Sequence, residues 1–290
     1  MSGGVDITNI NHVGMAVRDL AAAAARYEAM GFQLTPYSPH SAAWKPGDAV
    51  QPLGSGNRCI MFANTYLEIL ASEDPKRPAP RITNFLKHHQ GAHIICFDCP
   101  DCEAVDRRVQ GLGIETSGVI PLQREIDTPE GVRTAKFVRT QFDPKGSREG
   151  YIQASTHLTP DYIYQPRYIR HDNGCVQLAE TVLVADDFDA FEKKYQRYLG
   201  AEPSRDGNAI RFRLALGTML TIIDMRNANE YLPGTLLPPI PGIAAVVFRT
   251  PALAALRDRL AGQGFTVATI GDRILVPAED ACGVAMLFGS

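Results

Sequence analysis

The strongest constraint on the fold is a unit that occurs four times along the chain. Each copy has a strand-like apolar run, a helix-like segment that ends at a glycine, and extended chain that closes in another apolar or alternating run. The helix-like segments end at Gly31, Gly113, Gly200 and Gly264. Glycine adopts the left-handed conformation that commonly follows the last turn of a helix. The sequence therefore predicts four βαβββ modules.

These modules predict an α+β fold with two domains. A single module of this kind cannot close a sheet, so we expect the modules to pair and each pair to share a core. A segment that contains Pro and Tyr, residues 157–173, separates the second module from the third. We therefore expect domains at residues 1–157 and 172–290. Inserts at residues 36–57 and 72–90 are expected to carry loops.

Composition limits the classes of partner. The chain has 290 residues, of which 45% are hydrophobic and 21% charged, so an ordered protein is expected. Its net charge is −3 and its Lys and Arg residues are scattered, which argues against nucleic acid and anionic membranes as partners. It has no charged-then-apolar N-terminal segment and no long apolar run. We expect a cytoplasmic protein that acts on a small molecule.

Two histidines occupy similar places in the first two modules. His12 lies in the apolar alternating stretch INHVGMAV, which leads to a helix-start signal at Asp19, and His93 lies in GAHIICF. On a strand, His12 shares a face with Ile10 and Gly14. A lone strand histidine is more often a hydrogen-bonded core residue than a ligand. The occurrence of a second histidine in the sister module favours a shared function.

The four modules, with the motifs HVGMAVRDL and TYLEIL, resemble the glyoxalase, or vicinal-oxygen-chelate, superfamily. Within it the chain is similar to the glyoxalase-like group with a Gly-x-x-x-Thr-Pro turn followed by a histidine, here Gly31, Thr35, Pro36 and His40. The resemblance implies that each pair of modules forms a glyoxalase-like barrel.

The resemblance also implies a metal site, because the superfamily places its ligands on the first and last strands of each module. The matching residues here are His12, Glu68, His93 and Gln153. Two imidazoles and a carboxylate suit one divalent ion, which could be Zn, Ni, Co, Mn or Fe(II). Gln153 departs from the usual pattern, which has Glu four residues after a glycine, since it lies three residues after Gly150. Its role as a ligand stays open.

The corresponding positions in the second domain lack imidazoles. They are Glu180, Thr221, Ala244 and Met286. One carboxylate and one hydroxyl make a poor transition-metal site. The C-terminal domain is therefore expected to be structural, as a lid or as the surface of a homodimer, and the N-terminal domain to be the active one.

The resemblance implies a metal-dependent isomerase or lyase that stabilises an enolate, with Glu68 as ligand and base. An Fe(II) ring-cleaving dioxygenase is the second reading, and a non-catalytic binding or resistance protein is the third. Three further residues either line a substrate pocket or pack in the core: Trp44, Tyr66 and Tyr151. His40 lies in a predicted loop, where it either faces solvent or lines the pocket.

Overall fold

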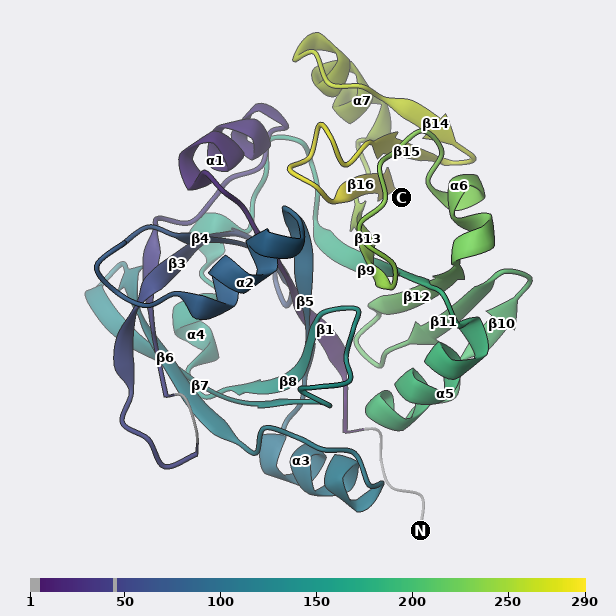
Figure 1. Ribbon diagram of the computed structural model, residues 1–290. Helices are drawn as coiled ribbons and strands as arrows, with labels where there is room; N and C mark the ends of the chain where they lie inside the picture. The colour runs from purple at the N-terminus through teal and green to yellow at the C-terminus, as the bar shows by residue number, and fades with distance from the viewer. Residues whose placement is uncertain (1–5, 44–45) are drawn as a thin grey trace.

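The computed structural model describes residues 6–43 and 46–290, and its first half forms a closed barrel (Figure 1). The strand order around this barrel is β1-β4-β3-β2-β6-β7-β8-β5. The first module consists of β1 (Asn9–Ala16), α1 (Leu20–Ala29), β2 (Ser38–Ala42), β3 (Gln51–Met61) and β4 (Tyr66–Ser72), and the second of β5 (Gly91–Asp98), α3 (Cys102–Gly111), β6 (Ile120–Thr128), β7 (Gly131–Gln141) and β8 (Tyr151–His157).

The second half forms an open sheet with the order β10-β11-β12-β9-β13-β16-β15-β14. Its modules are β9 (Gln177–Ala185), α5 (Phe188–Leu199), β10 (Ser204–Asp206), β11 (Ala209–Arg213) and β12 (Met219–Asp224), followed by β13 (Gly242–Arg249), α7 (Leu253–Gly262), β14 (Ala268–Ile270), β15 (Arg273–Val276) and β16 (Ala285–Gly289). The prediction of an α+β fold with four βαβββ modules is confirmed. The expected second barrel is instead an open sheet, because the short strands β10 and β14 lie at its two ends, whereas β2 pairs with β6 and closes the first unit.

Short connecting elements complete the chain. They are α2 (Pro80–His88), α4 (Pro160–Ile163), the 3₁₀ turns Pro166–Tyr168 and Met225–Asn227, and α6 (Ala228–Tyr231). The prediction of loops at residues 36–57 and 72–90 was wrong in part, since the first insert contains β2 and the start of β3 and the second contains α2. In the described part of the chain, no helix is long and apolar enough to cross a membrane.

Local sequence explains the helix boundaries. The Asp19 side chain accepts a hydrogen bond from the Ala22 amide and caps the start of α1. Gly31 follows the helix with a φ of +90°, a conformation that a β-carbon disfavours. The same aspartate cap occurs at α3 and α5, through Asp101 and Asp187.

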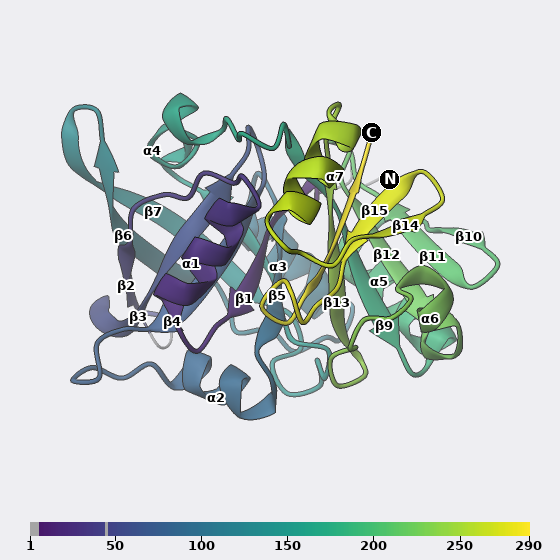
Figure 2. The ribbon, with the colours of Figure 1, turned by 90° about the horizontal axis from the view of Figure 1, so that it is seen from above.

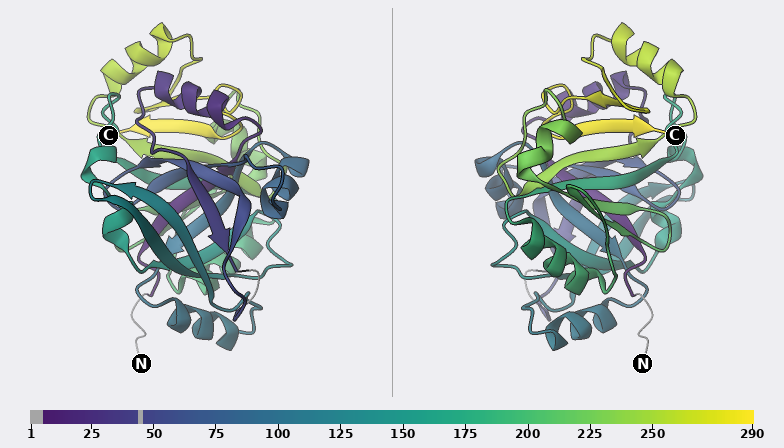
Figure 3. Two further views of the ribbon diagram at one scale, coloured as in Figure 1. Left: turned by 90° about the vertical axis from the view of Figure 1, so that its left-hand side faces the viewer. Right: turned by 90° about the vertical axis from the view of Figure 1, so that its right-hand side faces the viewer.

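The two units share one hydrophobic core. The Tyr27 hydroxyl of α1 donates to the Ala281 carbonyl at 2.9 Å, and Arg26 pairs with Asp280 at 2.7 Å. Figures 2 and 3 show α1 on the barrel, beside the C-terminal part of the chain. Every residue of β1 is buried, because one face of this strand lines the barrel interior and the other packs toward the second unit. The barrel interior is therefore the place where inward side chains of β1 can form a site.

Candidate functional site in the N-terminal barrel

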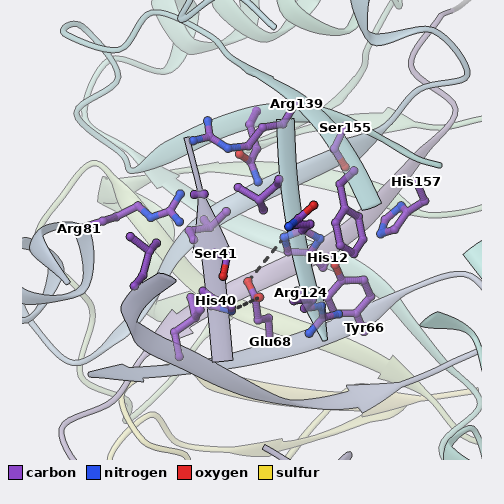
Figure 4. Close-up of a pocket in the computed structure, with 18 residues that line it drawn as sticks. His12, His40, Ser41, Tyr66, Glu68, Arg81, Arg124, Arg139, Ser155 and His157 are labelled. Carbon is purple, nitrogen blue, oxygen red and sulfur yellow. Dashed lines mark ion pairs between the residues drawn. The ribbon is translucent and has the colours of Figure 1, made fainter. Parts of the chain in front are cut away.

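A cavity of about 60 Å³ lies inside the barrel (Figure 4). This is room for about five water molecules, so it fits the reacting part of a small molecule. The polar residues that line it are His12 from β1, His40 and Ser41 from β2, Tyr66 and Glu68 from β4, Arg81 from α2, Gln123 and Arg124 from β6, Arg139 from β7, and Gln153, Ser155 and His157 from β8.

The protonation of His12 follows from its neighbour Asn11. The Asn11 amide nitrogen lies 3.3 Å from an Asp98 carboxylate oxygen and 2.9 Å from the Tyr164 hydroxyl, which orients the side-chain amide. Asn11 Oδ1 then faces His12 Nδ1 at 2.8 Å, and because this oxygen can only accept, Nδ1 carries the proton. The other ring nitrogen, Nε2, is left with a lone pair. It lies 3.7 Å from Glu68 Oε2.

Glu68 is held between two imidazoles. Its Oε2 faces His12, and its Oε1 lies 3.8 Å from His40 Nε2, as the dashed lines in Figure 4 mark. Asn57 of β3 donates to Oε1 at 2.5 Å, and the Asn57 carbonyl oxygen accepts from Arg124 at 2.8 Å. Glu68 is therefore fixed in direction and lies close to a buried cation.

Both flanking imidazoles are neutral at physiological pH. Burial lowers the pKa of His12 well below its usual value, and the nearby His157 and Arg124 lower it further. Burial lowers the pKa of His40 to about 4 in spite of the Glu68 charge. A neutral imidazole can accept a proton or coordinate a metal through its lone pair.

The cavity carries more positive than negative charge. Among the described residues that line it, Arg81, Arg124 and Arg139 face a single carboxylate, that of Glu68. Arg124 and Arg139 are 9% and 7% exposed. Buried guanidinium groups favour anionic ligands and raise the free energy of a bound cation.

His93 does not face this cavity, which corrects its placement beside His12. In the parallel strand pairs, His12 lies opposite Tyr66 and Ile94 lies opposite Tyr151, so Ile94 is the structural equivalent of His12. Since successive strand residues point to opposite faces, the one-residue offset turns His93 outward. There its Nε2 lies 3.0 Å from the His89 carbonyl oxygen, and its ring stacks on Phe85 at 4.6 Å.

The other predicted residues divide between two places. Gln153 and Tyr66 line the cavity, where Tyr66 stacks on His12 at 4.5 Å and Gln153 Oε1 has no hydrogen-bond partner among the described residues. His40, expected on a loop, lies on β2 and lines the cavity. Tyr151 lines a neighbouring cleft instead. Trp44 lies outside the described residues.

Sequence reasoning missed several lining residues, including Arg124, Arg139 and His157. Alternation on β7 could have indicated one of them, since Phe137 and Arg139 share an inward face. Arg124 on β6 needs the β2 to β6 pairing that closes the barrel, and this pairing has no local signal.

The chain does not reproduce the ligand set that the superfamily usually offers a divalent metal. Within residues 6–43 and 46–290, no group of three or more His, Cys, Asp or Glu side chains is arranged to hold an ion. His12 and Glu68 occupy two of the expected positions, but Ile94 and Gln153 stand at the other two. A catalytic metal usually has three protein ligands. The residues present therefore do not fit a complete site of that kind.

In the second unit, two of the four corresponding positions, Glu180 and Thr221, are engaged in polar contacts with each other and with Arg273, and the other two, Ala244 and Met286, are buried apolar residues. Thr221 donates to Glu180 at 2.5 Å, and Arg273 pairs with the same carboxylate at 3.2 Å. Glu180 is buried, whereas the Arg273 side chain is 38% exposed, so this carboxylate is already held by internal partners. That the N-terminal unit is the active one stays a prediction.

Comparisons with known proteins agree with this architecture. A family model described as "Glyoxalase-like domain" matches residues 10–199. A hypothetical protein from Staphylococcus aureus has a similar structure, with 11% identity, a TM-score of 0.68 and coverage of 97% of this chain and 99% of that chain. No curated protein sequence matches the chain.

Two further solved structures share the fold. A mutant of 4-hydroxymandelate synthase from Streptomyces coelicolor is 12% identical, with a TM-score of 0.57 and coverage of 98% of this chain and 92% of that chain. A fusion protein of a xylose isomerase-like TIM barrel and a 4-hydroxyphenylpyruvate dioxygenase is 11% identical, with a TM-score of 0.58; the match covers 99% of this chain and 49% of the fusion. Members of this superfamily are often enzymes and usually use a divalent metal. The family match, the modules and the barrel together show that the chain belongs to the glyoxalase-like domain family of the vicinal-oxygen-chelate superfamily.

Proposed function

We propose that this protein is an isomerase or lyase that moves a proton at a carbon next to a carbonyl group, with Glu68 as the base. One observation carries the proposal: the Glu68 carboxylate is enclosed in the barrel cavity, is oriented by Asn57 and lies between the neutral rings of His12 and His40. A general base needs a fixed direction and limited solvation, and both are present here.

The remaining residues match the other needs of such a step. When the C–H bond breaks, the proton goes to Glu68 and the electron pair moves onto the carbonyl oxygen. The buried Arg124 supplies positive charge for this oxygen. The lone pair on His12 Nε2 can accept a hydrogen bond from a substrate hydroxyl. Return of the proton to another carbon gives an isomerase, and loss of a leaving group gives a lyase.

Deuterium exchange tests this proposal. The protein is incubated in D₂O with small 2-oxo acids and aldehydes, and exchange next to the carbonyl is followed by proton NMR. Glu68→Gln should lower the exchange rate by about 100-fold or more, the usual contribution of a general base. The control is Glu73→Gln, which alters an exposed carboxylate just after the same strand. Equal rates in wild type and Glu68→Gln would refute the proposal.

A divalent-metal enzyme, including an Fe(II) dioxygenase, is the second candidate. It is favoured by one contact: His12 Nε2 and Glu68 Oε2 are both acceptors and face each other at 3.7 Å without a donor between them. If Glu68 acts as the base without a metal, deuterium exchange should continue after a chelator has removed divalent metal ions. Loss of exchange on chelation and its recovery with about one equivalent of Zn, Ni, Co or Mn would favour the metal enzyme. Stoichiometric O₂ uptake with a catechol and Fe(II) would favour the dioxygenase.

A further inference from the structure

Next to the barrel cavity lies a second, larger cleft of about 550 Å³. It runs between α2, the ends of β5 and β8, and the 239–242 segment of the second unit. The side chains that line both spaces are Ala42, Leu53, Arg81 and Arg139. These four residues form a neck between the inner cavity and the outer cleft.

The two arginines of the neck lie around one tyrosine ring. The Arg81 guanidinium lies 5.2 Å from the centre of the Tyr151 ring, and that of Arg139 lies 5.3 Å from the same centre. Arg139 also donates a hydrogen bond to the Tyr151 hydroxyl. Arg81 belongs to α2 and Arg139 to β7, and Figure 4 labels both among the residues that line the pocket. Two like charges are therefore held at one opening.

This arrangement leaves one buried donor of Arg139 without a hydrogen-bond partner among the described residues. Arg139 is 93% buried, since its exposed fraction is 7%, and its Nε is buried with no hydrogen-bond partner among the described residues. In the described part of the chain, neither Arg81 nor Arg139 forms an ion pair within 4.0 Å. A buried guanidinium without an anionic partner is costly, and a carboxylate that accepts two parallel N–H bonds would compensate it best.

We infer that the neck binds the carboxylate of an organic-acid substrate, with Arg139 and Arg81 as its cationic partners. This inference deepens the proposed function, on which it rests for the identity of the reaction. The reacting carbon then lies in the inner cavity toward Glu68, and substituents on the acid extend into the outer cleft. The inner cavity takes only a few heavy atoms, whereas the cleft has the volume of an ordinary ligand site.

Arg148 offers a matched control. It also borders the outer cleft, but it pairs with Asp186 at 2.9 Å, and its side chain is 59% exposed. Its charge is therefore compensated and hydrated. If the overall positive charge of the cleft attracted acids, replacing Arg148 would lower the affinity for pyruvate as much as replacing Arg81.

Calorimetric titration with pyruvate and with 2,3-butanedione, a neutral compound of similar size, tests the inference. Wild-type protein should bind pyruvate at least tenfold more tightly. Arg81→Gln and Arg139→Gln should each remove this preference, and Arg148→Gln should keep it. Arg81 is only partly buried, so its variant decides the outcome if Arg139→Gln does not fold. Equal affinity for the two compounds, or equal losses in Arg81→Gln and Arg148→Gln, would overturn the inference.

Two more arms separate the alternatives. Inorganic phosphate is titrated in parallel, and tight phosphate binding without pyruvate binding would overturn the assignment to a carboxylate. Glu68→Gln should keep pyruvate affinity within about threefold while it loses exchange of the methyl protons. Pyruvate binding without any exchange in wild type would refute the proposed reaction and leave the neck site intact, whereas exchange without a preference for pyruvate would do the reverse.

Discussion

Asn57→Leu is the sharpest test of how the site is held together. Asn57 is fully buried and bridges two charged groups, donating to Glu68 Oε1 at 2.5 Å and accepting from Arg124 at 2.8 Å. Hydrogen bonds to charged groups contribute about 1.5–3 kcal/mol each, so the two bonds sum to about 3–6 kcal/mol. Leucine has a similar size and gains apolar burial, which offsets about 1–2 kcal/mol. The expected net loss of unfolding free energy is about 3 kcal/mol.

Urea unfolding followed by circular dichroism measures this loss, and a fall in Tm of roughly 6–12 °C should accompany it. The deuterium-exchange rate should fall by about tenfold or more, because Glu68 loses the group that fixes its direction. Asn57 is thus a positioning residue.

Asn9→Leu is the matched control. Asn9 is 1% exposed and also makes two side-chain hydrogen bonds, to the Asn64 carbonyl at 3.0 Å and from the Thr218 hydroxyl at 2.6 Å. Its partners are neutral, so we expect a smaller loss of about 1–2 kcal/mol and no change in exchange. The reasoning would be refuted if the Asn57→Leu variant were at least as stable as the Asn9→Leu variant and kept the wild-type rate of deuterium exchange.

Three further outcomes are expected. His12→Ala should reduce exchange by tenfold or more while His93→Ala leaves it unchanged, as NMR can measure; equal losses would contradict the assignment of their faces. Glu180→Ala should lower Tm by several degrees, because it leaves the buried Thr221 hydroxyl without its acceptor and removes the partner of Arg273, without changing exchange or pyruvate affinity. Burial lowers the pKa of His171, whose Nδ1 accepts a hydrogen bond from the Gln33 amide. The contribution of the neutral ring to the free energy of unfolding is therefore fully present above the unfolded pKa of about 6.5, and it is lost as the pH falls below that value, because the unfolded state then binds a proton more readily than the folded state. Urea unfolding between pH 7.5 and 5 should therefore show a shallower loss of stability for His171→Gln than for wild type.

The sequence alone determined the modules and part of the site. Helix starts and stops depend on local chemistry, such as the aspartate cap at Asp19 and the left-handed glycine at Gly31, and these can be read without the fold. Strand alternation singled out His12, and the family resemblance added Glu68, which the barrel brings within 3.7 Å of His12. The family resemblance rests on the same local patterns in a fixed order.

Only the tertiary structure decided which residues complete the site. His93 and Ile94 are adjacent, and the pairing of β5 with β8 makes Ile94 the equivalent of His12. Because successive residues of a strand point to opposite faces, a difference of one residue places His93 on the face opposite to the cavity. Arg124 and Arg139 reach the cavity because β2 pairs with β6 and closes the barrel. Such pairings join residues at least 80 positions apart, and local propensity carries no information on them because their free energy comes from contacts that exist only once the barrel has formed.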